Sequence, residues 1–493
     1  MEGMGNGVRG SAEFEGWPRR VHLLGAGGAG VSGIGRILAG RGVEVSGHDR
    51  ADSQLLREFA RRVPAIEVGP SAASSLPADA ELVIRSAAVP VRDPQVVEAT
   101  ERGIPVLKYS EALPHLAAPA NQLAVAGTHG KTSTSWMLWH ALEGIAEGTG
   151  APVAGALIGG LSQNLGTNAL AASETAWFCL EACEYDRTFL RLSPFGAIIT
   201  NVEEEHLDCY GTMDAVHRAF ACFLDEVSSA GLIVLGRDVP EEVELGGRDT
   251  EIWRLGREFD VDLLGEERGR FSFRLRGPGW ATRAITLQVP GHFNVENAAL
   301  ALALAIGLGA RRSGKGPAEL CDAAASGIER FEGVARRFES WGRAGGVEVV
   351  HDYAHHPTEV RVTIEAARRT FPRRSLHVLF QPHQYSRTAR FLHEFADSLR
   401  AADRVVVADV YGARAHVDGE FVAEAGDLVR ELLKIGIPAE EGGALDAAVR
   451  RTVEALPARS ALLVLGAGDV DNIREALHEE LDHRLIEQRI NPG

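Results

Sequence analysis

Residues 122–142, QLAVAGTHGKTSTSWMLWHAL, constrain the fold more than any other stretch of the chain. A short apolar run is followed by a turn bounded by Gly127 and Gly130, then by Lys131 and Thr132, and then by a segment typical of a helix. Because a helix N-terminus presents unpaired N–H groups and a partial positive charge, a glycine-rich turn leading into one suits an anion. In such a loop the lysine reaches the β- and γ-phosphates, and the hydroxyl ligates Mg²⁺. The sequence therefore predicts a strand–loop–helix unit for nucleotide phosphates.

The match to the full phosphate-binding pattern is incomplete. The pattern G-x-x-x-x-G-K-[ST] needs a glycine at position 125, where this chain has Val125, so the loop has the shorter form G-T-x-G-K-T. The alternative is an ordinary glycine turn with a solvated lysine. The order of strand, loop, lysine, hydroxyl and helix favours the phosphate site.

Length and charge limit the classes of protein. A chain of 493 residues suggests about three domains of ~150 residues each. The formal charge of −17 argues against nucleic acid or an anionic membrane as the main partner, so a phosphorylated substrate must meet local positive groups.

The cysteines and the chain's first residues point to a reducing compartment. The five cysteines form no C-x-x-C pair. Cys179, Cys183, Cys209 and Cys222 lie close in sequence, which raises a metal cluster as a possibility. The irregular spacing favours buried small hydrophobic residues instead, as for the fifth cysteine, Cys321. Residues 1–20 lack the apolar core of a secretory signal, and the apolar run 298–310 is too short to span a bilayer and predicts a buried helix. We expect a cytoplasmic protein, monomeric or weakly dimeric.

The chain divides into segments that each begin with a predicted strand, followed by a turn rich in glycine or polar residues. In the first, Gly25, Gly27 and Gly30 fit G-x-G-x-x-G, and Asp49 ends the next strand. This fingerprint is compatible with NAD and equally with the diphosphate of another nucleotide. We predict an α/β protein with a disordered tail (1–20), a Rossmann-like nucleotide-binding domain (21–118), a central P-loop ATPase domain with a β-rich insertion around 230–290 (119–335), and a C-terminal Rossmann-like parallel-sheet domain (336–493).

Polar residues follow several other predicted strands. Glu181 ends an apolar strand and His206 lies beyond the next, so that with Thr132 they could surround Mg²⁺, although an exposed acid and a hydrogen-bonded loop histidine are the alternatives. Further on, HDYAHHPTEV and FQPHQYSRT place polar side chains after strands. An arginine fork there, on Arg387, would hold a small carboxylate, and solvated polar turns are the alternative.

Several ordered motifs together give the chain a family resemblance. GAGGAGVSGIGRIL, GTHGKTST, EACEYDRTFL, TNVEEEHLDCYG, PGHFNVENA, GVARRFE, DYAHHPTEV and FQPHQYSRT span nearly the whole length. With them the sequence resembles the Mur ligases, the ATP-dependent amino-acid ligases of peptidoglycan precursor synthesis. The resemblance implies that a UDP-sugar carboxylate is activated by ATP as an acyl phosphate and joined to an amino acid.

The resemblance also implies roles for particular residues. ATP would be bound by Gly127, Thr128, His129, Gly130, Lys131, Thr132, Ser133, Phe293, Asn297, Arg337 and Asp352, and Mg²⁺ by Thr132, Glu181 and His206. The UDP-sugar would be bound by Gly25, Gly27, Gly28, Gly30, Asp49 and Ser86, and the amino acid by Tyr353, His355, His383 and Arg387. Lys131, His206, Arg337 and His355 would be catalytic, with His355 or His383 as the base for the amine.

Some positions depart from the usual family pattern. Cys183 and Glu205 stand where aspartate is usual, Phe293 where histidine is, and Gln384 where an arginine is. Gln384 leaves Arg387 as the only arginine of its motif. No lysine follows the HLD region, which favours the branch that adds L-alanine to the lactyl carboxylate of UDP-N-acetylmuramate.

Three rival functions remain open at this point. A ligase of the same family could attach a recycled tripeptide to the same sugar nucleotide. An NAD-dependent oxidoreductase could be built on the first domain, with an accidental P-loop. A non-catalytic nucleotide-binding regulator would require that Gln384 and Cys183 mark decay of the site, which the retained Lys131, Thr132, Glu181 and His206 argue against.

Overall fold

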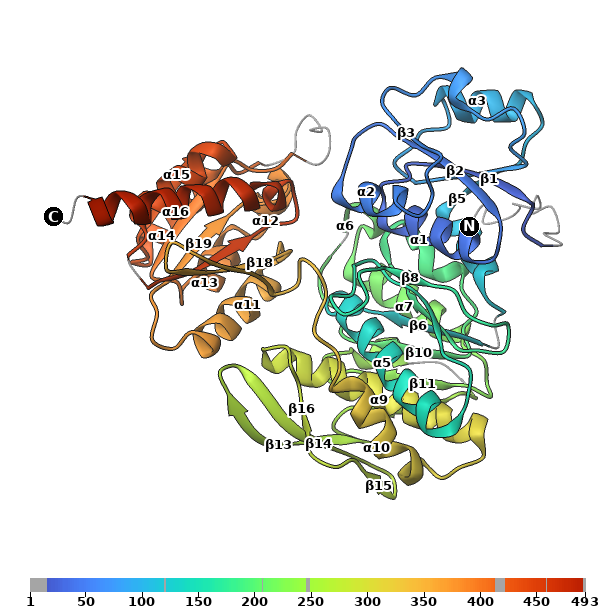
Figure 1. The fold of residues 1–493 in the computed structure, drawn as a ribbon. Coiled ribbons are helices and arrows are strands. Elements are labelled where there is room, and N and C mark those ends of the chain that lie inside the picture. Colours follow the sequence, from blue (N-terminus) through green and yellow to red (C-terminus); the bar gives the residue numbers. More distant parts are fainter. Residues whose placement is uncertain are drawn as a thin grey trace, which may run out of the picture.

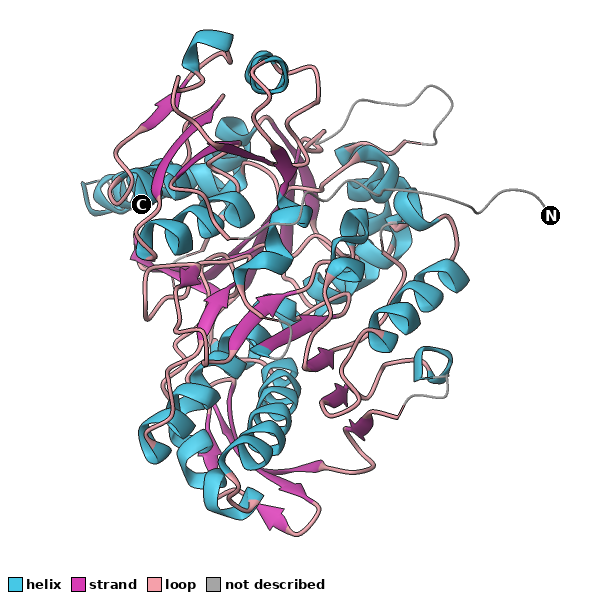
Figure 2. Cartoon of the chain, turned by 90° about the vertical axis from the view of Figure 1, so that its right-hand side faces the viewer, coloured by secondary structure: helices cyan, strands magenta, loops and turns pink. Residues whose placement is uncertain are grey.

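The computed structural model describes residues 16–118, 121–205, 207–244, 249–412, 422–457 and 459–490. Three α/β domains follow one another along the chain (Figure 1), and helices lie on both sides of their sheets (Figure 2). Most of the predicted tail falls outside the described residues, and the first strand begins at Arg20.

The N-terminal domain is a parallel sheet of five strands in the order β3-β2-β1-β4-β5. The strand order reverses between β1 and β4, and at such a switch point the loops leave a crevice for a ligand. The loops that follow these two strands carry Gly25 and Ser86. The elements are β1 (Arg20–Leu24), α1 (Ala29–Gly40), β2 (Glu44–Asp49), α2 (Gln54–Ala60), β3 (Ile66–Val68), β4 (Leu82–Arg85), α3 (Pro94–Glu101), β5 (Val106–Lys108) and α4 (Tyr109–Ala112).

The central domain contains a seven-stranded sheet in the order β12-β11-β10-β6-β9-β7-β8, in which only the short edge strand β8 is antiparallel among the described strands. Its strands are β6 (Gln122–Ala126), β7 (Gly155–Leu157), β8 (Ala169–Leu170), β9 (Phe178–Glu181), β10 (Gly196–Ile199), β11 (Leu232–Leu235) and β12 (Glu251–Arg254). Its helices are α5 (Lys131–Thr149), α6 (Leu207–Tyr210), α7 (Met213–Asp225), α8 (Glu241–Glu244), α9 (His292–Ser313) and α10 (Pro317–Ile328). Strand β6 lies between β10 and β9, so the loops after all three strands meet at one edge.

The β-rich insertion is narrower than the predicted 230–290. Strands β11 and β12 belong to the parallel sheet, because β11 pairs with β10 and β12 pairs with β11. The separate antiparallel sheet contains only β13 (Asp260–Glu267), β14 (Arg270–Gly277), β15 (Trp280–Ala281) and β16 (Ile285–Thr286). A buried apolar strand such as β11 has the same sequence pattern in a parallel sheet as in a separate β-rich insertion. The pattern therefore could not show that the insertion begins only at β13.

Helix α9 is the apolar helix expected at 298–310, and it extends further at both ends. Its 22 residues are long and apolar enough to cross a membrane by length and composition, but 83% of the apolar window is buried inside the protein. It packs against α5 and α10 in the largest core cluster, where Trp136, Leu304 and Phe331 are almost fully buried. The helix is therefore accounted for as a core helix.

The C-terminal domain has a sheet in the order β17-β18-β22-β19-β20-β21, with β17 antiparallel and the other pairs parallel. Its strands are β17 (Glu339–Ala344), β18 (Val347–Asp352), β19 (Leu376–Phe380), β20 (Arg404–Ala408), β21 (Ala439–Gly443) and β22 (Ala461–Leu465). Its helices are α11 (Pro357–Thr370), α12 (Tyr385–Arg390), α13 (Leu392–Ser398), α14 (Ala425–Lys434), α15 (Leu445–Ala455) and α16 (Arg474–Ile490).

The connection between the second and third domains has an unusual backbone. Arg336 and Phe338 have φ angles of +65° and +45°, which residues with a side chain rarely adopt. The Phe338 N–H is held by the Asp352 carboxylate at 2.8 Å, and the Tyr353 N–H by the Arg336 carbonyl at 2.8 Å. These bonds to the end of β18 fix Arg337 between the two domains.

Candidate active site between the central and C-terminal domains

The predicted phosphate loop lies between β6 and α5. Gly127 and Gly130 have positive φ, and a Cβ on Gly127 would lie 2.1 Å from Thr200 Oγ1, so only glycine fits there. Lys131 Nζ folds back over the loop and donates to the carbonyls of Gly127 and Thr128 at 2.6 and 2.9 Å. The loop thus has the backbone shape that a phosphate site needs.

Lys131 is paired with an acid that the sequence interpretation had not assigned. Its Nζ lies 3.0 Å from the carboxylate of Glu184, which is 3% exposed. Burial acts to lower the pKa of Lys131, but Glu184, together with its neighbours Cys183 and Glu181, outweighs burial and raises it above its usual range. The lysine is therefore a full positive charge held ready beside the loop.

Thr132 and Glu181, predicted to bind Mg²⁺, are in contact. The Thr132 hydroxyl donates to Glu181 Oε1 at 3.1 Å, while Glu181 Oε2 accepts the Gly159 N–H at 2.7 Å. Oxygen donors of this kind suit a hard cation. The third predicted ligand, His206, lies outside the described residues.

A cavity of about 640 Å³ opens beside the loop, between α9, the antiparallel sheet and the C-terminal domain. Asn297 reaches the loop from α9, since a Cβ on Gly130 would lie 2.7 Å from its Oδ1. The predicted ATP residues in the cavity wall are His129, Gly130, Thr132, Ser133, Phe293, Asn297, Arg337 and Asp352, whereas Gly127, Thr128 and Lys131 do not line it. Most of the residues predicted to bind ATP, from both domains, thus share one cavity.

Asp352 was predicted to contact the ribose of ATP, but in this structure its carboxylate binds backbone N–H groups. Its two carboxylate oxygens accept the N–H groups of Phe338 and Ala354, both at 2.8 Å. Burial raises the pKa of Asp352 to about 6. Its first role in this structure is to shape the connection that carries Arg337.

Three consecutive acids after β10 join the central domain to the C-terminal domain. Glu203 Oε2 accepts the Thr358 hydroxyl at 2.7 Å, and Glu205 Oε1 accepts Arg387 Nη2 at 2.5 Å. Between them, Glu204 pairs with Arg390. We call Glu203, Glu204 and Glu205 the acidic triplet. Sequence alone could not show that each member has its own partner about 150–190 residues away.

Glu359, on the first turn of α11, links the parts of the site and was not predicted. Its carboxylate lies 3.2 Å from Arg337 Nη1, 3.4 Å from His129 Nδ1 and 3.2 Å from His355 Nδ1. Burial would raise the pKa of Glu359, but His355, His129 and Arg337 outweigh burial and hold it well below its usual range. An acid three residues after the N-cap of a helix is common because it stabilises the helix start. The sequence therefore gave no sign that Glu359 also contacts Arg337, His129 and His355.

His129 is the phosphate loop's own link to the third domain. Its ring lies between Glu203, 3.5 Å from Nε2, and Glu359. Burial acts to lower the pKa of His129, but the two carboxylates outweigh burial and raise it to about 9. His129 is therefore cationic at neutral pH.

The four residues predicted to bind the amino acid lie together. The His355 ring meets Tyr353 and His383 edge to face, with ring centres 5.3 and 5.8 Å apart. Burial, with His355 and Arg387 nearby, lowers the pKa of His383 to about 4. Arg387 is engaged by Glu205, so an incoming carboxylate would have to share or replace that pairing.

Gln384, which stands where the family usually has an arginine, supports the start of α12 through its backbone. It precedes α12 with a φ of +70°, and its carbonyl accepts both the N–H and the hydroxyl of Thr388. The residue therefore serves the start of the helix that presents Arg387, whatever its side chain contributes.

The N-terminal glycine loop has its predicted partners around it. Asp49 Oδ2 accepts the Gly27 N–H at 2.8 Å, and the Gly28 N–H bonds to the Gly25 carbonyl at 3.1 Å. A Cβ on Gly25 would lie 2.8 Å from Ser86 Cβ, and one on Gly30 would lie 2.5 Å from the Tyr109 ring. Tyr109, which covers Gly30, was missed because nothing in its sequence neighbourhood marks a ligand.

The prediction that the cysteines are buried small residues is wrong for part of the set. Cys179 and Cys321 are buried, but Cys183 and Cys209 are half-buried and Cys222 is exposed. Cys183 lies close enough to Lys131 and Glu184 for their charges to act on it, and burial raises the pKa of its thiol to about 12. The thiol is therefore neutral beside the phosphate loop.

Comparison with known proteins covers all three domains. Residues 20–120 match the description "Mur ligase family, catalytic domain", residues 125–305 "Mur ligase middle domain", and residues 336–468 "Mur ligase, glutamate ligase domain". The UDP-N-acetylmuramate–L-alanine ligase of Kineococcus radiotolerans is 41% identical over 92% of this chain and 94% of that protein.

Two solved structures have the same fold. The UDP-N-acetylmuramate–alanine ligase of Thermotoga maritima superposes with a TM-score of 0.74 at 24% identity, covering 96% of this chain and 100% of that one. The murein peptide ligase of Psychrobacter arcticus superposes with a TM-score of 0.67 at 21% identity, covering 94% and 99%. At these identities the structures support the fold alone, whereas the sequence matches identify the family. The chain belongs to the Mur ligase family.

Proposed function

We propose that this protein is an ATP-dependent ligase that joins L-alanine to the lactyl carboxylate of UDP-N-acetylmuramate, releasing ADP and phosphate, in peptidoglycan precursor synthesis. The observation that carries the proposal is 41% identity, over 92% of this chain, to a protein named for that reaction. Such an enzyme would work in the cytoplasm, where its nucleotide substrates are found.

The first chemical step needs positive charge around a transferring phosphoryl group. A free carboxylate is a poor acylating agent, so the lactyl carboxylate attacks the γ-phosphate of ATP and becomes an acyl phosphate. Lys131 and Arg337 reach this place from two domains, and both now rest on carboxylates, Glu184 and Glu359. The phosphates of ATP would take over these cations, and positioning with charge neutralisation would carry most of the rate.

Thr132 and Glu181 would hold Mg²⁺. Their oxygens already meet at 3.1 Å at the entrance to α5, and a hydroxyl with a carboxylate is a donor set that suits this ion. When bound, Mg²⁺ supplies charge neutralisation at the β- and γ-phosphates.

The second step needs a base for the amine of L-alanine. His383 is a weak proton acceptor because its pKa is lowered to about 4. His355 is better placed, because its Nδ1 lies 3.0 Å from the Tyr353 carbonyl and 3.2 Å from Glu359, which orients the ring, and its Nε2 lies 4.0 Å from Glu205. We assign the base to His355, with Tyr353, His383 and Arg387 framing the amino acid.

The proposed reaction is tested by phosphate release from ATP with UDP-N-acetylmuramate and a panel of acceptors. L-alanine should support turnover, and the preformed tripeptide should not. Turnover with the tripeptide alone would instead establish the recycling ligase. A change in nicotinamide absorbance without ADP release would establish an oxidoreductase built on the first domain.

A further inference from the structure

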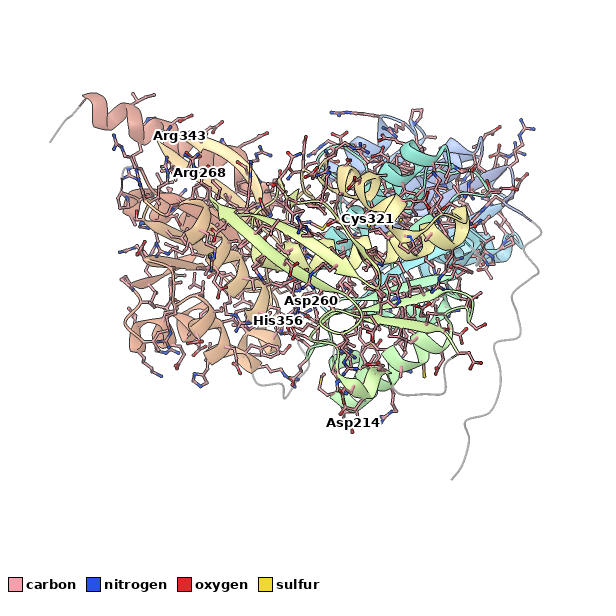
Figure 3. The ribbon with its side chains drawn as sticks, turned by 90° about the horizontal axis from the view of Figure 1, so that it is seen from below. Asp214, Asp260, Arg268, Cys321, Arg343 and His356 are labelled. Atoms are coloured by element: carbon pink, nitrogen blue, oxygen red, sulfur yellow. The ribbon has the colours of Figure 1, made fainter. Side chains whose placement is uncertain are left out.

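One group of metal-binding side chains lies outside the proposed Mg²⁺ site. His129 of the phosphate loop, Glu205 of the acidic triplet and His356 before α11 each offer one ligand atom, and these atoms all lie within 4.8 Å of one another. Two of these residues belong to the central domain and one to the C-terminal domain. Figure 3 shows His356 where the two domains meet.

Both imidazoles have a buried nitrogen without a hydrogen bond among the described residues, the Nε2 atom of His129 and that of His356. Nε2 of His129 does have an ionic neighbour, because the Glu203 carboxylate lies 3.5 Å away. His356 is 5% exposed, and the two ring centres lie 4.8 Å apart. A buried polar atom without a hydrogen bond lowers the stability of the fold. Two such nitrogens close together therefore suggest a ligand that both could bind.

The other ring nitrogens face groups that support metal binding. Nδ1 of His129 lies 3.4 Å from the Glu359 carboxylate, an arrangement in which a carboxylate orients an imidazole. Because His129 is cationic without a metal, a metal on Nε2 would displace the proton that now faces Glu203. Nδ1 of His356 lies 3.9 Å from Glu203 and makes a long contact of 3.4 Å with the Thr358 N–H. With a metal on Nε2, that Nδ1 would carry the proton and turn to Glu203.

The ligand set selects the class of ion. Two imidazoles and one carboxylate suit Zn²⁺ and its borderline neighbours, whereas Mg²⁺ prefers oxygen donors only. Ligand atoms around a tetrahedral zinc lie about 3.3 Å apart. The group would therefore contract by roughly 1.5 Å from its present spread, by drawing the two domains together or by rotation of the Glu205 side chain.

We propose that His129, Glu205 and His356 form a site for a divalent transition-metal ion that joins the phosphate loop to the C-terminal domain. The site is separate from the pair Thr132 and Glu181, and its occupation would hold the two domains closed on each other. It does not depend on the proposed ligase reaction, because its readout is metal binding.

The test is titration of the full chain, freed of metal, with Co²⁺ in the presence of excess Mg²⁺. Mg²⁺ occupies oxygen sites and is colourless, whereas Co²⁺ on imidazoles gives strong visible absorption. We expect one such Co²⁺ per chain, displaced by Zn²⁺, and a rise in unfolding temperature with Zn²⁺. His356→Asn keeps an acceptor for the Thr358 N–H but removes Nε2, and should weaken Co²⁺ binding by at least the roughly 10–100-fold that loss of a supporting residue costs.

Two further variants keep the result decisive. Glu205→Gln should weaken Co²⁺ binding in the same way, and it decides the matter if His356→Asn fails to fold by circular dichroism. His393→Asn removes a histidine that is 82% exposed and should leave Co²⁺ binding unchanged. No absorption with Mg²⁺ in excess, or full affinity in both site variants, or a loss in His393→Asn as well, would overturn the proposal.

Discussion

The glycine loops after β1 and after β6 share a plan of strand, glycine turn and helix, but they differ in what completes them. The first is completed mainly by its own domain, where Asp49 accepts the Gly27 N–H and Tyr109 covers Gly30, and the central domain adds a neutral hydrogen bond from Asn168 to the Ala29 carbonyl. The second carries Lys131, paired with Glu184, and reaches the C-terminal domain through His129 and Glu359. The first loop is suited to hold a diphosphate, whereas the second also brings cationic side chains to a phosphate.

The difference indicates that the backbone of a glycine loop is enough to bind a phosphate. Phosphoryl transfer also needs charged side chains and a second domain that closes on the loop. Backbone N–H groups at a helix start can hold an anion without changing it. Phosphoryl transfer needs charge that follows the transferring group, together with closure against water. Variants of the second loop should therefore affect turnover, and variants of the first should affect only UDP-sugar binding.

The largest effect is expected for Lys131→Ala. Loss of the cation should lower kcat for ADP release by roughly 10³-fold or more, since one lost charge-stabilising donor alone costs 10²–10³. The variant should also lose stability, because Glu184 is left as a buried, unpaired carboxylate, at a cost of about 3–5 kcal/mol. Steady-state ADP release and thermal unfolding measure the two effects.

The double variant Lys131→Ala with Glu184→Gln separates these effects. It removes the unpaired charge, so the unfolding temperature should recover while activity stays absent. Recovery of turnover in the double variant would show that Lys131 acts only as the partner of Glu184, and the contrast between the two loops would then be lost.

The next largest effect is on the pH dependence of stability through His129. Its pKa is raised to about 9 from an ordinary value of 6.5, so its ion pairs stabilise the fold fully below pH 6.5 and are lost as pH rises through 9. The upper limit of this contribution is about 3 kcal/mol, at 1.36 kcal/mol per pKa unit. Chemical unfolding between pH 6 and 10 should show wild type losing this stability.

His129→Gln should remove that pH dependence, because glutamine does not titrate in this range. The N-terminal loop provides the contrast, since the described contacts of its glycines include the backbone carbonyl of His48 but no histidine side chain. A slope that is the same in wild type and His129→Gln between pH 6.5 and 9 would contradict the assignment.

Sequence reasoning recovered the parts of this protein that are local along the chain. The phosphate loop, Asp49 at the end of β2 and the helix begun by Pro357 were all predicted from short patterns with a physical reason. Local patterns failed for β11 and β12, because a buried strand in a parallel sheet carries no mark of its neighbour. The three-domain α/β fold was confirmed because it depends mainly on the alternation of strands and helices.

The contacts between domains could not be predicted in the same way. Glu359 and Tyr109 lie at ordinary helix starts and Glu184 lies in a loop, and their roles depend on partners far along the chain. Arg387 was predicted as a carboxylate holder, and its role stays a prediction, but its present partner Glu205 is visible only once the domains are together. Electrostatic coupling between distant segments is a property of the fold.

A smaller effect is expected in the N-terminal loop. Asp49→Ala removes the acceptor of the Gly27 N–H and should weaken UDP-sugar binding about tenfold, since a hydrogen bond to a charged group is worth about 1.5–3 kcal/mol. Asp49→Asn keeps an acceptor oxygen and should have a smaller effect. The KM for ATP should be unchanged in both variants, and a rise in the KM for ATP equal to that for the UDP-sugar would remove the separation between the two loops.

The smallest effect concerns the edge of the interface that completes the second loop. Glu204 and Arg390 are both about half exposed, so solvent screens their pairing, and a double-mutant cycle should give no more than about 1 kcal/mol, a factor of about five in kcat/KM for ATP. The neighbouring pair, Glu205 and Arg387, has side chains only 7% and 11% exposed, and the same cycle should give a larger coupling because water screens it less. Kinetics is the readout for these pairs, because closure of the third domain on the phosphate loop should affect turnover directly. If the exposed pair coupled more strongly than the buried pair, then exposure would not govern how the third domain completes the phosphate loop, and closure would have to be explained by the geometry of the Arg336–Phe338 connection instead.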